Sequence, residues 1–94
     1  MIEEFWQLYF RLQKMFGLSY ATGQNSREVY LRIYYANGEL FSISLKPDHY
    51  LDIKNPNDIA EGEELKERVY ARAKDKLQSW AEKKFEEMNI NYKL

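Results

Sequence analysis

The chain has no cysteine and only one histidine among its 94 residues. The lack of cysteine excludes disulfide frameworks, thiolate catalysis and cysteine-based zinc sites. It agrees with a reducing compartment. No apolar run approaches the ~18 residues of a membrane span, and the first residues lack the basic region and cleavage site of a signal peptide. We therefore expect a cytoplasmic protein.

The one histidine, His49, follows Pro47 and Asp48 in a segment with turn composition. As a general base it would need a nucleophile and an orienting group nearby, so we interpret it as a solvated side chain. The sequence also contains no Gly-rich phosphate loop, no H-E-x-x-H pattern and no calcium-loop pattern. We therefore expect a protein that is not an enzyme and binds neither a metal nor a cofactor.

Charge is balanced, with 14 basic and 15 acidic residues, and the length fits a single domain over residues 1–94. Aromatic residues stand out, since the chain has eight tyrosines, five phenylalanines and two tryptophans. Tyrosine provides a large rigid contact area with a polar tip, and it is favoured at protein interfaces.

Residues 28–46 are predicted to form a β-hairpin whose loop decides which side chains face the core. A two-residue loop at Asn37 and Gly38 would mix Arg32 into the apolar row. A three-residue loop over 36–38, with Gly38 in the left-handed conformation of a G1 bulge, separates the rows. A one-residue slip would misplace several apolar groups, each worth about 1.5 to 3 kcal/mol, so we expect this second register. It pairs Tyr35 with Glu39, Ile33 with Phe41, Leu31 with Ile43 and Val29 with Leu45, and it gives an outer row of Tyr30, Arg32, Tyr34, Leu40, Ser42 and Ser44.

The remaining segments predict helices on both sides of this hairpin. Residues 2–16 have helical apolar spacing, with Trp6 and Phe10 beyond the edge of the apolar stripe, where they either contact a second element or face a partner. Residues 18–21 fit a short strand, and 49–53 alternate as a possible strand with Leu51 and Ile53 inward. A long helix is expected from about 58 or 63 to 88, with Gly62 as a possible break, followed by a polar tail over 89–94. Its core stripe would comprise Leu65, Val69, Tyr70, Ala73, Leu77, Trp80, Ala81 and Met88.

This order predicts an α+β fold, with a helix, an antiparallel hairpin or three-stranded meander, and a long C-terminal helix. Both helices would then lie on one face of the sheet. The other face would stay open to water or to a partner.

The leading functional hypothesis is a small non-catalytic protein-interaction module. Its candidate surface is Tyr30, Arg32, Tyr34 and Ser42, supported by Trp6 and Phe10, because Tyr and Arg dominate interface hot spots. Such a module could be an inhibitor or adaptor that occludes a larger protein, as phage-type accessory and anti-defence proteins do. A homodimer or a structural subunit of a larger complex is an alternative.

A second alternative is binding of single-stranded nucleic acid. From Arg68 to Lys84 six basic residues face two acidic ones, a net charge of +4. Arg68, Arg72, Lys76 and Lys83 fall on one stripe of the helix and would contact phosphates, while Tyr30 and Tyr34 stack on bases. The macrodipole of the helix also accounts for this polarity, and the pI near 5.8 gives nucleic acid no general attraction. Protein is therefore the preferred partner.

Overall fold

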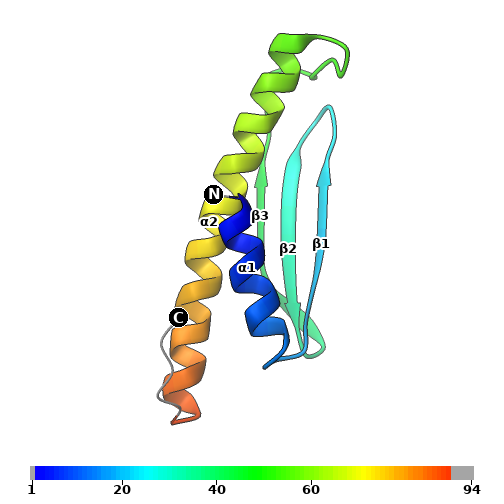
Figure 1. Ribbon diagram of the computed structural model, residues 1–94. Helices are drawn as coiled ribbons and strands as arrows, with labels where there is room; N and C mark the ends of the chain where they lie inside the picture. Colours follow the sequence, from blue (N-terminus) through cyan, green and yellow to red (C-terminus); the bar gives the residue numbers. More distant parts are fainter. Residues whose placement is uncertain (1, 90–94) are drawn as a thin grey trace.

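The chain folds as a helix, a three-stranded antiparallel meander and a second, long helix (Figure 1). The computed structural model describes residues 2–89, so the predicted tail, apart from Asn89, lies outside the described residues. The elements are α1 (Ile2–Gln13), β1 (Leu18–Gln24), β2 (Val29–Tyr35), β3 (Gly38–Leu45) and α2 (Pro56–Glu87).

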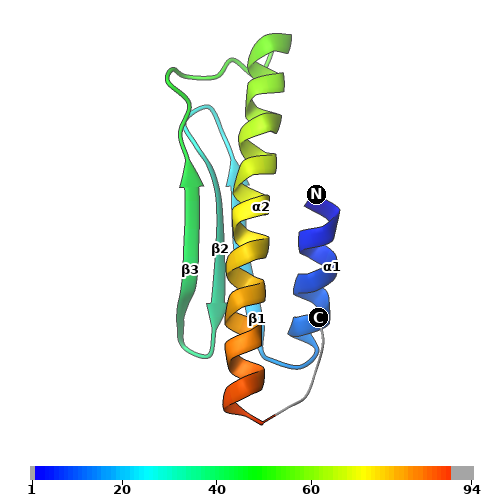
Figure 2. The same ribbon diagram turned by 90° about the vertical axis from the view of Figure 1, so that its left-hand side faces the viewer.

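Both helices cover the same face of the sheet, which confirms the predicted α+β architecture (Figures 1 and 2). α1 packs over β1, and α2 packs over β2 and β3, while the two helices also contact each other. No element of residues 2–89 covers the opposite face of the sheet. β1 and β3 are the two edge strands.

The third strand of the meander is β1, whereas the predicted strand over 49–53 does not form. Residues 46–55 instead cross from β3 to α2 without regular structure, and they are tied to the loop after β1 by a hydrogen bond from the Leu51 N–H to the Ser26 carbonyl. Leu51 is buried as expected, but Ile53 is 76% exposed. The period-two pattern was misleading because the N-terminus of α2, rather than a sheet edge, holds this segment.

The hairpin has the predicted pairing over most of its length but a different turn. Val29, Leu31 and Ile33 pair with Leu45, Ile43 and Phe41, as expected. The loop is only Ala36 and Asn37, so the predicted pairing of Tyr35 with Glu39 is wrong. Tyr35 pairs with Gly38 and Tyr34 with Glu39. Ala36 has the positive φ, at 57°, and Gly38 does not.

An extra residue in β3, Leu40, restores the separation of apolar and polar side chains onto opposite faces of the hairpin. Leu40 forms a bulge between the Tyr34–Glu39 and Ile33–Phe41 pairs. Without this bulge the two-residue loop would turn Ser42 and Ser44 toward the helices. The parity argument was therefore right, but the extra residue lies in the strand and not in the turn. As a consequence Leu40 packs against the core and does not belong to the outer row.

The core lies between the sheet and the two helices, and most of the predicted stripe of α2 is buried in it. Trp80 is only partly buried, and Met88 is 52% exposed because the end of α2 extends past the sheet. Phe85, which the prediction missed, fills that end beside Phe16. The fully buried large side chains are Phe5, Tyr9, Leu12, Val29, Leu31, Ile33, Val69 and Leu77.

α2 runs without a break through Gly62 and begins earlier than predicted. Asn55 caps it by accepting the Asn57 N–H at 2.9 Å, and Pro56 occupies the first turn. Gly62 is buried because Gln24 and Leu51 lie against it, and it does not end the helix. With 32 residues, α2 spans about 48 Å, close to the 50 Å long axis of the molecule.

α1 ends at Gln13, three residues before the predicted end. A turn follows, in which the Phe16 N–H donates to the Leu12 carbonyl and Phe16 enters the core. Neither helix combines the length and apolar composition that crossing a membrane requires, within the residues described.

Candidate functional site

The outer face of the sheet carries the predicted row of Tyr30, Arg32, Tyr34 and Ser42. Val29, Leu31 and Ile33 are buried under the helices, so the residues that alternate with them in β2 project to the other side. Arg32 pairs with Ser42 across the strands, and both are exposed, while Tyr30 and Tyr34 are half-buried. The structure thus brings the four predicted residues onto one face.

Tyr30 is held in place by its neighbours on this face. It pairs with Gly23 of β1, and a Cβ atom at Gly23 would lie 2.6 Å from Tyr30 Cε1. The phenol ring therefore lies across the glycine. The Arg32 guanidinium in turn sits 5.2 Å from the centre of the Tyr30 ring, within cation–π range. The role of Gly23 could not be predicted, because it depends on the pairing of β1 with β2.

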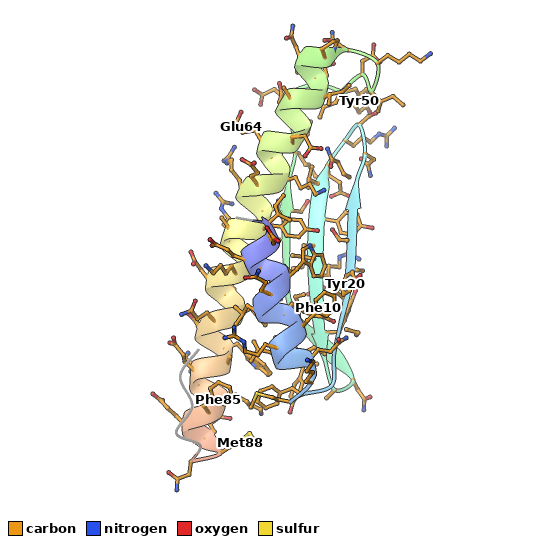
Figure 3. The ribbon with its side chains drawn as sticks, in the orientation of Figure 1. Phe10, Tyr20, Tyr50, Glu64, Phe85 and Met88 are labelled. Carbon is orange, nitrogen blue, oxygen red and sulfur yellow. The ribbon has the colours of Figure 1, made fainter. Side chains whose placement is uncertain are left out.

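Trp6 and Phe10, the other predicted contact residues, differ in their surroundings. The Trp6 ring contacts Tyr20 of β1 and Tyr70 of α2, so Trp6 is mainly packed between elements. Phe10 is 47% exposed and stacks on Trp6, and Tyr20 beside it is 44% exposed. Figure 3 shows Phe10 and Tyr20 on the same side of the molecule. Tyr20 was missed by the prediction, although its alternation with Leu18 and Thr22 would have placed it on the helix side of β1.

The four predicted cations of α2, Arg68, Arg72, Lys76 and Lys83, are all exposed. Within residues 2–89 none of them forms an ion pair or a side-chain hydrogen bond. Two other lysines of the same helix are paired. Lys74 donates to Glu4 at 2.9 Å, which lowers the pKa of that carboxyl group, and Lys84 lies 3.7 Å from Glu87.

A groove of about 390 Å³ separates this flank of α2 from β3. Leu40, Phe41 and Trp80 provide apolar lining, and Lys76 and Lys83 lie at the groove with Asp75 and Ser79. Lys76 and Lys83 are seven residues apart, about 10 Å along the helix, with Trp80 between them. The bulged residue Leu40 lines part of this groove, whereas the prediction had placed the bulge at Gly38.

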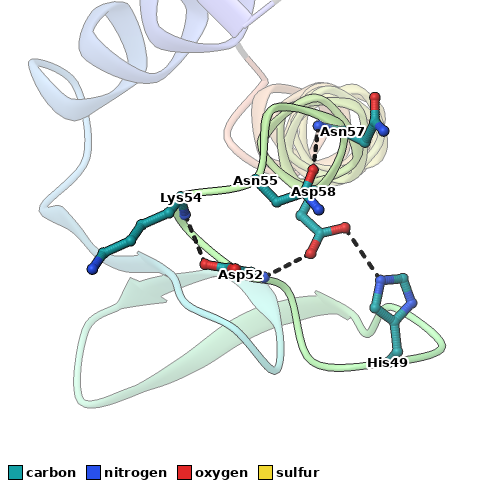
Figure 4. A network of polar contacts seen from close by, with 6 residues as sticks. All are labelled: His49, Asp52, Lys54, Asn55, Asn57 and Asp58. Carbon is teal, nitrogen blue, oxygen red and sulfur yellow. Dashed lines mark hydrogen bonds and ion pairs between the residues drawn. The ribbon is translucent and has the colours of Figure 1, made fainter.

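A cleft of about 560 Å³ lies elsewhere, beside the 46–55 segment, and contains none of the predicted contact residues. Near it, the Asp58 carboxylate accepts the Asp52 backbone N–H at 2.8 Å and lies 3.3 Å from His49 Nε2 (Figure 4). These contacts hold the pKa of the Asp58 carboxyl group below its ordinary range, and the backbone hydrogen bond from Asp52 has the largest effect. The network has a structural explanation, because it fastens the segment to the start of α2.

Two of the predicted surfaces are on opposite sides of the sheet. Tyr30 and Tyr34 project from the bare face, whereas Arg68, Arg72 and Lys76 belong to the helix layer. One nucleic-acid strand would have to pass around the β3 edge to contact both sets. The described residues contain no cluster of three or more His, Asp or Glu side chains suited to hold a metal ion.

Comparison of the chain with protein-family models, with curated proteins and with solved structures found no match. The class of the protein is therefore defined by its own architecture, a two-layer α+β domain with an open sheet face.

Proposed function

We propose that this protein is a small non-catalytic protein-interaction module that binds a larger protein through the open face of its sheet. The observation that carries the proposal is the ordered row in which Arg32 stacks over Tyr30 and Tyr30 rests on Gly23. A side chain that is already held in one conformation loses little entropy on binding, and Tyr and Arg are the residue types that anchor interfaces.

Occlusion of a partner's surface needs no chemistry from the module, so an inhibitor or an adaptor is the form of this function we favour. A cytoplasmic location is part of the proposal and rests on the absence of cysteine. The separation of the tyrosines from the α2 cations argues against one single-stranded nucleic acid using both.

The proposal is tested by affinity capture from cells that naturally contain the protein, with wild type and the double variant Tyr30→Ser/Tyr34→Ser. Both positions lie outside the core, so the fold should be retained, as circular dichroism would show. We expect a partner that the wild type captures and the double variant loses. Tyr50→Ser is the matched control, since Tyr50 is 69% exposed in the 46–55 segment. Equal capture by wild type and double variant would contradict the proposal, and light scattering would show whether the partner is a second copy.

A further inference from the structure

The groove between α2 and β3 combines three features: an apolar floor, positive charge that is not paired within residues 2–89, and a free strand edge. We infer that it binds an extended, acidic segment of a partner protein that carries an apolar side chain among its carboxylates. The inference rests on the proposed function in its broad form, a protein-binding module, but it concerns a second surface.

The apolar contribution comes from Leu40, Phe41 and Trp80. All three are only partly buried by the rest of the molecule, so a partner side chain placed between them would remove further apolar surface from water. A groove of about 390 Å³ has room for one or two apolar side chains. Trp80 also offers an indole N–H that a backbone carbonyl or carboxylate can accept.

The positive charge of the groove favours a partner segment with negative charge. Lys76 and Lys83 flank Trp80, and Arg68 and Arg72 continue the same flank of α2 toward its N-terminus. None of the four has a partner within residues 2–89. Asp75 is the one acidic residue that lines the groove beside Lys76 and Lys83. Carboxylates spaced along an extended segment would complement it.

The strand edge explains why a polypeptide fits better than a nucleic acid. β3 is an outer strand, and past its bulge at Leu40 it is regular from Phe41 to Leu45. Its outward N–H and C=O groups are arranged to pair with another extended backbone, the mode called β-augmentation. A segment added there would run beneath the cationic flank of α2, which lies over β2 and β3 (Figure 2).

The test is a selection from a random library of displayed 12-residue peptides on the immobilised wild-type protein and on the charge-reversed variant Lys76→Glu/Lys83→Glu. We expect the wild type to enrich peptides rich in Asp and Glu with an aromatic or aliphatic residue. The variant should lose them, with affinity reduced about tenfold or more, and should enrich basic peptides instead. Lys46→Glu/Lys54→Glu is the matched control, with the same charge change on exposed residues outside the groove, and should behave as wild type.

Nuclear magnetic resonance with an enriched peptide locates the contact. We expect the largest shifts at the Trp80 indole and at the amides of Ser42 to Leu45, and the same affinity for the Tyr30→Ser/Tyr34→Ser variant. Loss of binding in that variant would instead place the peptide on the open face. This comparison therefore distinguishes a failure of this inference from a failure of the proposed function. The inference would be overturned if no peptide is enriched, or if the enriched peptides have no acidic bias. It would also be overturned if oligothymidine displaces the peptide, and so reverses these shifts, at a concentration lower than that of the peptide.

Discussion

The hydroxyl oxygens of Tyr70 in α2 and Thr22 in β1 lie 3.1 Å apart and connect the long helix to the far edge of the sheet. The Thr22 hydroxyl also lies 2.9 Å from the Tyr30 carbonyl, to which it donates its only proton. Tyr70 is therefore the donor in the pair, and Thr22 accepts. This chain of two hydrogen bonds runs from the helix layer to the backbone of the residue whose ring lies on the open face.

Replacement of Tyr70 by Phe tests this connection. Tyr70 is buried, and its ring would be kept, while Thr22 would still donate to the Tyr30 carbonyl. We expect the free energy of unfolding to fall by about 0.5 to 1.5 kcal/mol, the usual net contribution of one hydrogen bond. Urea unfolding measures it. Tyr50→Phe provides the control, and a Tyr70→Phe variant as stable as wild type would show that the bond contributes nothing.

Ile33 and Ile53 form a matched pair for the core. Both occupy positions with period-two spacing, but Ile33 is fully buried and Ile53 is 76% exposed. We expect Ile33→Ala to cost about 2 to 5 kcal/mol of unfolding free energy and Ile53→Ala less than about 0.5 kcal/mol. Equal losses in thermal or urea unfolding would mean that residues 49–53 do pack as a strand.

This pair also shows how far sequence reasoning reaches in this molecule. The alternation in β2 determined the predicted register of the hairpin, because over these seven residues only one register places the apolar groups of both strands on the same face. The five residues 49–53 show the same alternation, but a hydrogen bond to the Ser26 carbonyl and the carboxylate of Asp58 place them in a loop. The bond to Ser26 joins residues distant in sequence, and the Asp58 carboxylate belongs to the next element, so the alternation of residues 49–53 reveals neither contact.

The candidate surfaces were predictable to a similar extent. Once the register was known, the outward direction of Tyr30, Arg32 and Tyr34 followed from parity. The support of Tyr30 by Gly23 did not, because it requires knowledge that β1 is the neighbour of β2. The α2–β3 groove was also hidden, since it depends on where the hairpin places its bulge.

Gly62→Ala should stabilise the protein. Alanine is favoured over glycine by about 1 kcal/mol in the interior of a helix. The added Cβ would meet Gln24 Nε2 at 2.7 Å, but this is the free end of an exposed side chain that can turn away, and Leu51 at 3.5 Å leaves room. We expect a gain of up to about 1 kcal/mol in urea unfolding. Addition of Gln24→Ala removes the contact, and a loss of stability in both variants would show that Leu51 cannot adapt.

Asp58 should make stability depend on pH. Its pKa is lowered by the Asp52 N–H and by His49, so its charge stabilises the fold above the ordinary carboxyl pKa of about 4. That stabilisation is lost as the pH falls through the lowered pKa of the folded state. We expect Asp58→Asn, which keeps the acceptor oxygen, to be less stable than wild type at neutral pH, with the difference closing in acid below about pH 4. Glu4→Gln should change stability with pH in the same direction, because Lys74 lowers the pKa of Glu4. A difference for Asp58→Asn that is constant with pH would contradict the assignment.

Gly23→Ala should disturb the open face without removing any of its side chains. The new Cβ would occupy the place of the Tyr30 ring, so Tyr30 must rotate and Arg32 must lose its position above it. We expect shifted ring resonances of Tyr30 and, if the open face is the binding surface, about tenfold weaker partner binding. Gly38→Ala is the control, because a Cβ there meets nothing within 4 Å. Unchanged Tyr30 resonances would show that the ring is not held by Gly23.

The packing of α1 against α2 has a consequence for biosynthesis. The strands of the meander can pair with their sequence neighbours as they leave the ribosome, but the apolar face of α1 has no helical partner until α2 has been made. Folding of the complete core therefore has to wait for α2. Until then the aromatic residues of α1 remain available to chaperones.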